Sequence, residues 1–301
     1  MHTTMAISEA QFETWARPPS ETEEGRCDNA LRVISEALRE KFGDQVLVFL
    51  KGSYKNRTNV REDSDVDLGV KHNDVYFPDT FSLSDREKWV YERISTNSTY
   101  LFSQFKSEVH QVLVARFGAS EAIRRNKCIL VKANSYRVNA DVVPCFTYKK
   151  FRSPTEVSAE GIKSIADDGR AFDSFPDQHY ANGVSKNART QRMYKSVTRI
   201  LKNVRNELLD LRQIDKKLMP SFFLECLTWN VPDPLFTANS YKEATRNIML
   251  RLWNDMGNLV ISQEYAEISN LKGLFEGHPQ RTPEQVRSFL QNAWSFLGYE
   301  G

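Results

Sequence analysis

Long hydrophobic runs are absent from this sequence. No stretch of about 18 consecutive apolar residues occurs in the chain of 301 residues, which excludes a membrane-spanning helix of the usual length. The segment from Met1 to Thr14 also lacks the apolar centre that marks a secretory signal peptide. We therefore expect a cytoplasmic protein without a membrane partner.

An excess of charge of one sign is also absent. The 41 basic and 39 acidic residues leave a formal net charge of +2, which excludes a protein that coats nucleic acid with a generally basic surface. A local basic patch is still compatible with this total, because the charges can be unevenly placed. Hydrophobic residues make up 40% of the chain and charged residues 27%, as in ordinary globular proteins with one large or two smaller domains.

Cysteine is scarce. The four cysteines form no Cys-x-x-Cys pair, and their spacing fits no zinc-binding pattern (Cys27, Cys128, Cys145 and Cys226). Cys128 and Cys145 stand among mostly apolar neighbours, which indicates buried thiols in a reducing compartment. We expect no disulfide framework.

Hydrophobic spacing divides the chain into a mixed first half and a helical second half. Apolar residues three and four apart predict helices, and short β-branched runs predict strands. The expected helices are 21–42, 84–117 with a weak point at 96–99, 185–211, 221–229, 241–257 and 282–297, and the expected strands are 46–50, 65–70, 129–131 and 140–146. The last two strands are compatible with a hairpin. Residues 150–184 show no period and are expected to form a loop or crossover.

Three carboxylates stand in two of the predicted strands. Asp65 and Asp67 are two residues apart, so both side chains project from the same face of a strand. Asp-x-Asp pairs are common on solvated loops, but the apolar neighbours of this pair predict a buried strand. Asp141 lies inside a second β-branched run, where a buried carboxylate needs a partner or a metal. Hard divalent ions such as Mg²⁺ suit all-oxygen sites, so three carboxylates on adjacent strands predict a two-metal site for phosphoryl transfer.

A glycine-serine turn precedes these carboxylates. Gly52-Ser53 directly follows the strand 46–50 and lies twelve residues before Asp65. Glycine lets the backbone approach a ligand closely, and the amides that follow can point at a phosphate if a helix begins there.

Together these motifs resemble a known family. The turn, the Asp-x-Asp pair and the third carboxylate are similar to the nucleotidyltransferase fold of the DNA polymerase β superfamily. The fuller pattern, Lys51 to Val60 and then Ser64 to Asp67, more closely resembles the bacterial cGAS/DncV-like nucleotidyltransferases (CD-NTases), which make cyclic di- or trinucleotide second messengers in antiphage defence. The similarity covers most of the chain.

The resemblance implies an α+β, bilobal, polymerase β-like fold with a mixed sheet, flanking helices and a helical C-terminal lobe. The expected domains are a nucleotidyltransferase core with an N-terminal spine helix over residues 1–180 and a helical lobe over residues 181–301. The resemblance also implies that Asp65, Asp67 and Asp141 are catalytic and hold two Mg²⁺ ions, for which Mn²⁺ can substitute. Gly52 and Ser53 would bind the triphosphate of the donor NTP.

Seven basic side chains and no acidic one lie between residues 186 and 206. On a helix, Arg192, Lys195, Arg199 and Lys202 fall within about 80° of one another, and apolar residues gather on the opposite face. A solvated face is the usual interpretation, but such faces normally include acidic partners four residues apart. Their absence favours a face that presents four cations to an anionic ligand.

The resemblance also implies nucleotide contacts in the second half of the chain. Lys202 on the long helix and Ser221 at a later helix start match residues that contact the triphosphate. Lys195 and Arg199 would be further phosphate contacts. Phe222 matches an aromatic residue that stacks on the base.

Two of these assignments have structural alternatives. Phe222 is equally compatible with the core, because Phe223 adjoins it. In some related enzymes an Asn in the lid region favours uracil, and Asn182 is the candidate here, although Asn before Gly183 also suits a turn. His179 has no partner at metal-ligand spacing, and we assign it no role.

The residues and the resemblance together predict a template-independent nucleotidyltransferase. It would join two NTPs, such as ATP and UTP, into a cyclic dinucleotide for antiphage signalling, with release of pyrophosphate. We expect a monomer that needs no nucleic acid and whose product acts on a separate effector. The alternatives are transfer of a nucleotide to RNA or protein, and a nucleotide sensor without catalysis. The bases, the linkage and the ring size are left open.

Overall fold

The protein is divided into two compact units in a computed structural model that describes residues 7–60, 65–277 and 279–299. The strand unit comprises residues 20–54 and 64–176, and the helical unit comprises residues 1–19, 55–63 and 177–301. This division differs from a single cut after residue 180, because residues 7–19 and 55–60 pack with the second half of the chain. Ser64, part of the motif that carries the family resemblance, lies outside the described residues.

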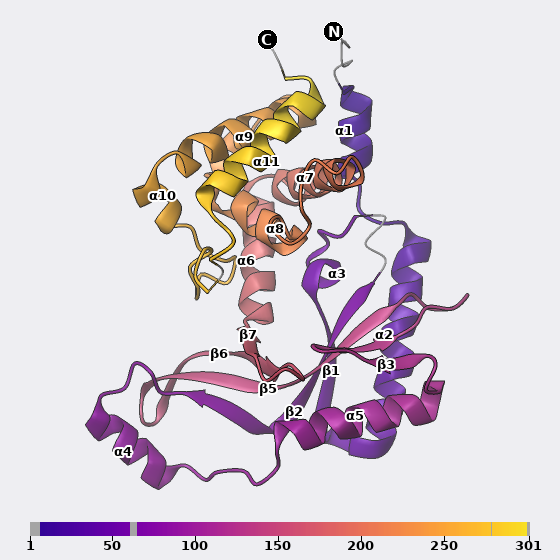
Figure 1. Ribbon diagram of the computed structural model, residues 1–301, viewed down its shortest axis with the longest axis vertical. Coiled ribbons are helices and arrows are strands. Elements are labelled where there is room, and N and C mark those ends of the chain that lie inside the picture. The colour runs from indigo at the N-terminus through magenta and orange to yellow at the C-terminus, as the bar shows by residue number, and fades with distance from the viewer. Residues whose placement is uncertain (1–6, 61–64, 278, 300–301) are drawn as a thin grey trace. The chain divides into compact units, whose positions relative to one another are not determined.

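The strand unit is built on a seven-stranded mixed sheet (Figure 1). In chain order its elements are α2 (Glu21–Phe42), η1 (Gly43–Gln45), β1 (Val46–Lys51), α3 (Gly52–Asn56, which runs into the helical unit), β2 (Val66–Asp79), α4 (Asp85–Ile94), α5 (Phe102–Phe117), β3 (Ala122–Arg124), β4 (Ile129–Val131), β5 (Ala140–Ser153), β6 (Glu156–Ile165) and β7 (Ala171–Ser174). The strand order is β1-β2-β5-β4-β3, and β6 pairs with both β5 and β7. Only β2 and β5 run parallel among these pairs. The sheet and its flanking helices confirm the predicted fold class.

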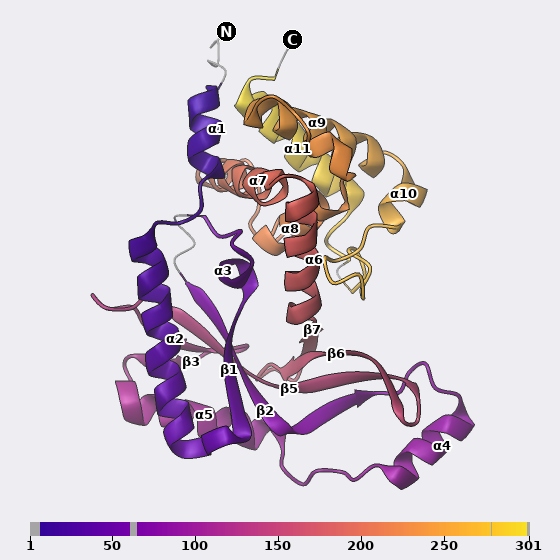
Figure 2. The same ribbon diagram turned by 180° about the vertical axis from the view of Figure 1, so that it is seen from behind.

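The helix α2 has the predicted bounds. The Ser20 hydroxyl accepts a hydrogen bond from the Glu23 amide, and Gly43 ends the helix with a φ of +56°, which favours glycine. The apolar side of α2 packs beside α5, and Figures 1 and 2 show the two helices next to each other.

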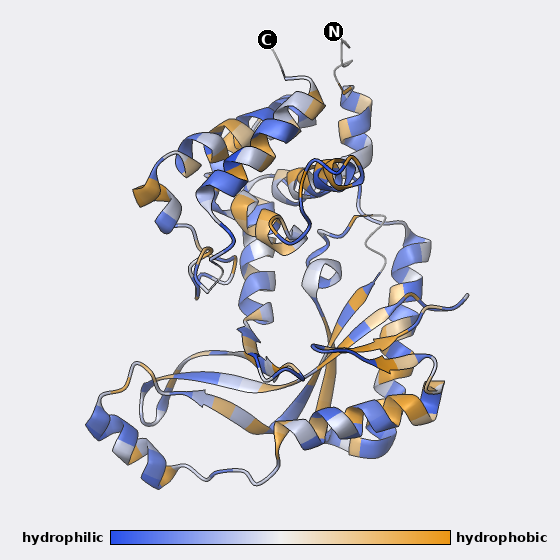
Figure 3. Ribbon diagram, viewed as in Figure 1, coloured by the Kyte–Doolittle hydropathy of each residue, from blue (hydrophilic) through white to orange (hydrophobic). Residues whose placement is uncertain are grey.

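One face of the sheet forms the core of the strand unit. Alternate residues of β1, β2 and β5 are buried against α2 and α5: Val46, Val66, Leu68, Val70, Ala140, Val142 and Phe146. Figure 3 shows hydrophobic residues concentrated on these central strands, whereas α4 is mostly hydrophilic. Because strand side chains alternate, the residues between the buried ones project from the opposite face.

Three expectations for this unit need correction or refinement. The predicted loop over residues 150–184 is wrong, since it contains β6, β7 and the start of α6 (Pro176–Arg189). The first half of β6 is exposed, so main-chain pairing with β5 forms this strand and no hydrophobic period marks it. The weak point at 96–99 separates α4 from α5, and β4 pairs antiparallel with β5, as the proposed hairpin required.

The helical unit is arranged around α7 (Figure 2). Its elements are α1 (Glu9–Ala16), α6, α7 (Met193–Asp210), α8 (Ser221–Asn230), η2 (Asp233–Phe236), α9 (Tyr241–Met256), α10 (Leu259–Gln263) and α11 (Pro283–Leu297). The apolar face of α7 lies in a continuous core with α1, α8, α9 and α11. None of the described helices is long and apolar enough to cross a membrane.

The predicted helix over residues 185–211 is interrupted. Gln191 and Arg192 have φ values of +50° and +71°, so the chain turns between α6 and α7. The predicted helices after this point are confirmed within one or two residues. All four cysteines are buried and free, as expected.

Replacing Leu38 tests the core of the strand unit. Leu38 is fully buried on α2, so Leu38→Ala should lower the free energy of unfolding by about 2–5 kcal/mol, because the cavity loses its contacts. Urea denaturation followed by circular dichroism measures this loss. Leu47, on β1, is 44% exposed, and Leu47→Ala should cost less than about 1 kcal/mol. Equal losses in the two variants would contradict the assigned core.

Candidate functional site

Two predicted catalytic carboxylates lie side by side. Asp67 on β2 and Asp141 on β5 are register partners in the parallel pair. Their neighbours along each strand are buried under α2 and α5, so both carboxylates project from the opposite face. Adjacent strands are about 4.8 Å apart, which brings these half-buried like charges close together.

Asp65 occupies a different position from the one predicted. It precedes β2 and is exposed, so it is not the strand residue that the Asp-x-Asp spacing suggested. The side chain of Asn139 donates a hydrogen bond to Asp65 Oδ1 over 3.0 Å, and the Val66 amide donates to the Asn139 carbonyl over 2.9 Å. Asn139 thus ties Asp65 to the start of β5. Sequence reasoning missed this residue, which stands two positions before Asp141.

The glycine-serine turn is packed against the carboxylates. Gly52 opens the short helix α3 with a φ of +68°, and Ser53 follows it. A Cβ atom at position 52 would overlap Oδ2 and crowd the rest of the Asp67 carboxylate. Position 52 therefore requires glycine for two reasons: its backbone conformation and its contact with Asp67.

The donor atoms in this part of the strand unit fit a hard divalent cation. Asp141 Oδ1 is buried and has no hydrogen-bond partner among the described residues, although such atoms are normally paired. Across the described part of the chain, no group of three or more His, Cys, Asp or Glu side chains is gathered for a metal. Water and substrate phosphates would therefore have to complete the coordination shell, as is usual for Mg²⁺.

A neutral thiol borders the same carboxylate. Burial raises the pKa of Cys128 to about 12, and the charge of Asp141 and a hydrogen bond to it contribute in the same direction. The thiol is therefore protonated at neutral pH and acts as a donor toward Asp141. Its apolar sequence neighbours predicted burial but not this contact.

In the helical unit, the predicted phosphate contact Lys202 is engaged by a carboxylate. Lys202 is 1% exposed, and its ammonium lies 2.8 Å from Glu225 Oε2. Thr58 and His179 also donate to Glu225, over 2.7 Å and 3.1 Å. Burial raises the pKa of Glu225, but the Lys202 charge and the hydrogen bond from His179 outweigh it and hold this pKa well below its usual range.

This network corrects the expectation of an open cationic face on α7. Lys195, Arg199 and Lys202 are all at least nine-tenths buried. The acidic partner that the basic segment lacks comes from α8 instead. Glu225 is itself a charged residue inside an apolar run. This pattern could have predicted the pairing, because a buried carboxylate requires a cation.

Ser221 and Phe222 begin α8. Phe222 is 41% exposed, while Phe223 is fully buried, so the core alternative for Phe222 is wrong. The Phe222 ring lies 5.7 Å from the His179 ring, which Glu225 holds in place. His179, to which the sequence assigned no role, thus supports an exposed aromatic surface.

Asn182 is a helical residue. It lies within α6, and its side-chain amide donates to the Ile268 carbonyl over 2.7 Å. The turn alternative for Asn182 is therefore wrong.

The remaining predicted phosphate contacts, Lys195 and Arg199, line a pocket of about 710 Å³ within the helical unit. Lys202, Ser221 and Phe222 do not line it. The structure therefore separates the basic residues of α7 into two groups.

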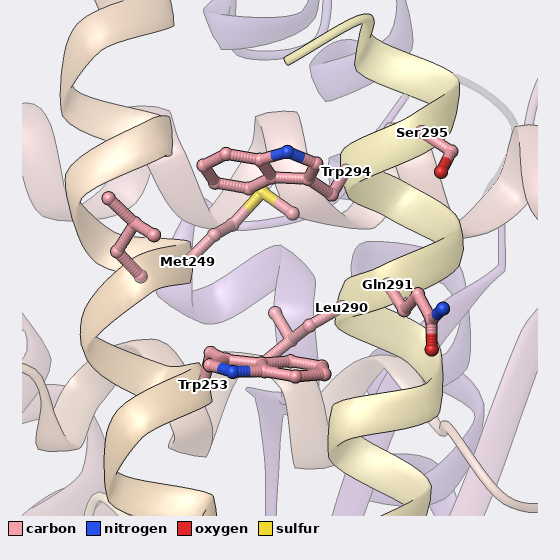
Figure 4. Close-up of a pocket in the computed structure, with 7 residues that line it drawn as sticks. Met249, Trp253, Leu290, Gln291, Trp294 and Ser295 are labelled. Carbon is pink, nitrogen blue, oxygen red and sulfur yellow. The ribbon is translucent and has the colours of Figure 1, made fainter. Parts of the chain in front are cut away.

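A second pocket, between α9 and α11, has different chemistry. It has a volume of about 400 Å³, and its lining is apolar apart from Gln291 and Ser295. Figure 4 shows the indoles of Trp253 and Trp294 at its two ends, with Met249 and Leu290 between them. It offers no charged group for a phosphate or a metal.

The variant Glu225→Gln tests the buried ion pair. It leaves Lys202 as an unpaired buried charge, so the free energy of unfolding at pH 7 should fall by about 3–5 kcal/mol. Urea denaturation followed by tryptophan fluorescence measures the loss.

The double variant Glu225→Gln/Lys202→Met removes both charges and should recover at least half of that loss. In the wild type, the stabilisation from the low pKa of Glu225 is complete above the usual carboxyl pKa of about 4.3 and declines as the pH falls below it. In the single variant Glu225→Gln, the free energy of unfolding should not show this decline at low pH. A double variant as unstable as the single one would contradict the pairing.

Comparisons with known proteins agree with this geometry. Residues 181–298 match a family model described as the cGAS/DncV-like nucleotidyltransferase C-terminal helical domain. A cyclic dipurine nucleotide synthase from Elizabethkingia meningoseptica is 43% identical over 98% of this chain and 100% of its own length.

Solved structures give the same result. The Elizabethkingia meningoseptica CdnE cyclic dinucleotide synthase, solved with GTP and Apcpp, has a TM-score of 0.82 at 40% identity and covers 97% of this chain and 100% of its own. The Rhodothermus marinus CdnE c-UMP-AMP synthase, solved with Apcpp and Upnpp, has a TM-score of 0.82 at 30% identity, with 98% of both chains covered. The predicted resemblance is confirmed: the chain belongs to the cGAS/DncV-like nucleotidyltransferases.

Proposed function

We propose that this nucleotidyltransferase condenses two NTPs into a cyclic dinucleotide that signals in antiphage defence. The observation that carries the proposal is the register of Asp67 and Asp141, with Gly52 packed against Asp67. Membership of the family and the orphaned oxygen of Asp141 support it.

Asp65, Asp67 and Asp141 would hold two Mg²⁺ ions, or Mn²⁺ in their place. The ions would supply charge stabilisation for the phosphoryl transfer and lower the pKa of the attacking hydroxyl. In the first step a ribose hydroxyl oxygen of one NTP bonds to the α-phosphorus of the other, and in the second the remaining hydroxyl bonds to the α-phosphorus of the linear intermediate's own 5′-triphosphate. In each step the bond to pyrophosphate breaks, and Asp141 is the candidate acceptor of the hydroxyl proton. Two such steps close the ring. Asn139 would orient Asp65 through its hydrogen bond.

Each unit contains residues to which the family resemblance assigns nucleotide contacts. Gly52 and Ser53 would bind the donor triphosphate, and Ser221 would contribute its hydroxyl. Phe222 would stack on a base, since its ring is exposed and supported by His179. Because Glu225 engages the Lys202 ammonium, we assign Lys202 to holding α7 against α8 rather than to phosphate contact.

The proposed substrates are drawn from ATP, UTP and other NTPs. The two solved relatives differ in this respect, since one was solved with GTP and Apcpp and the other makes c-UMP-AMP. Asn182 would read a base edge through its side-chain oxygen and its second N–H, since its first N–H donates to the Ile268 carbonyl. We further propose a monomer that requires no nucleic acid and whose product acts on a separate effector.

Incubation with pairwise NTP mixtures tests the function. The purified protein, supplied with Mg²⁺ or Mn²⁺ and no acceptor, should release pyrophosphate and form a phosphatase-resistant cyclic dinucleotide, identified by mass spectrometry. Asp67→Asn and Asp141→Asn should each lower turnover by about a thousandfold or more, because the metal-bound charge is lost. Label transferred only to added RNA or protein would favour the first alternative, and NTP binding without pyrophosphate release would favour a sensor.

Gly52→Ala tests the contact between the turn and Asp67. The new methyl group should displace the Asp67 carboxylate and lower turnover about a hundredfold or more, since misplacement by about 1 Å can have such an effect. Gly118→Ala is the matched control: Gly118 has a φ of +93°, but a Cβ there would meet nothing within 4 Å. It carries similar backbone strain and should retain most of the activity. Comparable turnover in the two variants would show that the Asp67 contact is unimportant.

A further inference from the structure

The pocket of about 710 Å³ in the helical unit is strongly basic. It is lined by residues from the end of α1, the segment after α3, the end of α6 and the first half of α7. Five of the lining side chains are cationic (Arg17, Arg57, Arg192, Lys195 and Arg199), and one is acidic (Glu13).

Two of these cations are buried and have no carboxylate partner among the residues that the structure describes. Lys195 is 9% exposed and Arg199 is 7% exposed. The Arg199 guanidinium donates to the carbonyls of Ala16 and Arg57 over 2.7 Å and 2.6 Å, and these acceptors are neutral. Within the described residues, neither Lys195 nor Arg199 forms an ion pair. Burial lowers the pKa of Lys195, and it lowers that of Arg199 to about 10, so their charges are poorly compensated.

Two other buried lysines in the same two helices do have carboxylate partners. Lys186 on α6 is paired with Asp233 over 2.7 Å, and Lys202 on α7 is paired with Glu225 over 2.8 Å. A buried charge without a partner is strongly unfavourable, and this unit supplies a carboxylate for Lys186 and for Lys202. The contrast indicates that the counter-charge for Lys195 and Arg199 comes from a ligand.

The backbone between α6 and α7 also brings a cation to this pocket. Arg192 is exposed and has a φ of +71°, a left-handed conformation that is unusual for a residue with a side chain. This turn sets Arg192 in the lining beside Lys195 and Arg199.

We propose that this pocket binds a multiply charged phosphate group, separately from Ser221 and Phe222. Its ligand is the phosphate chain of a nucleotide or free pyrophosphate, which share the same chemistry. A concave site with two buried cations suits such a compact anion better than the extended backbone of a nucleic acid. This goes beyond the proposed function, because binding here depends on neither the catalytic carboxylates nor a divalent metal.

Calorimetric titration of the full chain with inorganic triphosphate tests the proposal. In EDTA and at low salt, the wild type should bind the anion, and Arg192→Gln should weaken binding about tenfold or more through the loss of a charge-assisted contact. Arg212→Gln is a matched control, since Arg212 is also an exposed arginine of the helical unit with a positive φ, +56°, and does not line the pocket. Its affinity should stay within about twofold of the wild type. Equal weakening in the two variants would overturn the proposal.

The variant Asp67→Asn separates this pocket from the proposed catalytic carboxylates. It should bind inorganic triphosphate as the wild type does, even where it abolishes product formation. If it weakened binding as much as Arg192→Gln, the anion would lie at the catalytic site and the proposal would be wrong. A wild type that binds triphosphate but forms no cyclic product would count only against the proposed function.

Competition experiments distinguish the sources of the phosphate. Displacement of triphosphate mainly by ATP would support a nucleotide ligand, and displacement mainly by pyrophosphate would support the released product. Arg192-dependent binding of duplex RNA without binding of inorganic triphosphate would overturn the small-ligand proposal.

Discussion

The parallel pairing of β2 with β5 places Asp67 and Asp141 at the same register, and other features of the strand unit follow from holding these like charges together. Alternation along the strands sends their neighbours into the core under α2 and α5, which anchors both strands. Gly52 allows the chain to pass directly against Asp67, and Asn139 ties Asp65 to the beginning of β5. Two close carboxylates repel each other unless a cation lies between them. The unpaired, buried oxygen of Asp141 is consistent with such a role.

In the helical unit, the charges that need compensation are positive. Its central helix α7 is buried on its basic side as well as its apolar side, and each buried cation therefore needs compensation. Glu225 compensates Lys202 and also holds His179, which lies against Phe222. One carboxylate thus links the packing of α7 against α8 to the position of an exposed aromatic ring. Lys195 and Arg199 have neutral contacts only within the described residues, and this difference separates structural cations from those available to a ligand.

Membership of the family does not by itself determine the substrates. Relatives in this family are named for purine products and for a mixed pyrimidine and purine product. The proposed reaction needs a few charged atoms at a defined register, whereas the proposed base contacts, Asn182 and Phe222, have neighbours from distant parts of the chain.

Local patterns in the sequence were enough to predict the helix α2, the strands that carry the carboxylates, and the family motif, because capping, alternation and a glycine-serine turn are short-range signals. They could not show that β6 exists, since its outer half is exposed and is held by pairing with β5. They also misjudged the basic residues of α7, because the partner of Lys202 lies 23 residues away on α8. Periodicity shows which side chains share a face, but burial and pairing depend on what folds against that face. For this reason Asn139, His179 and Glu225 emerged only from the three-dimensional arrangement.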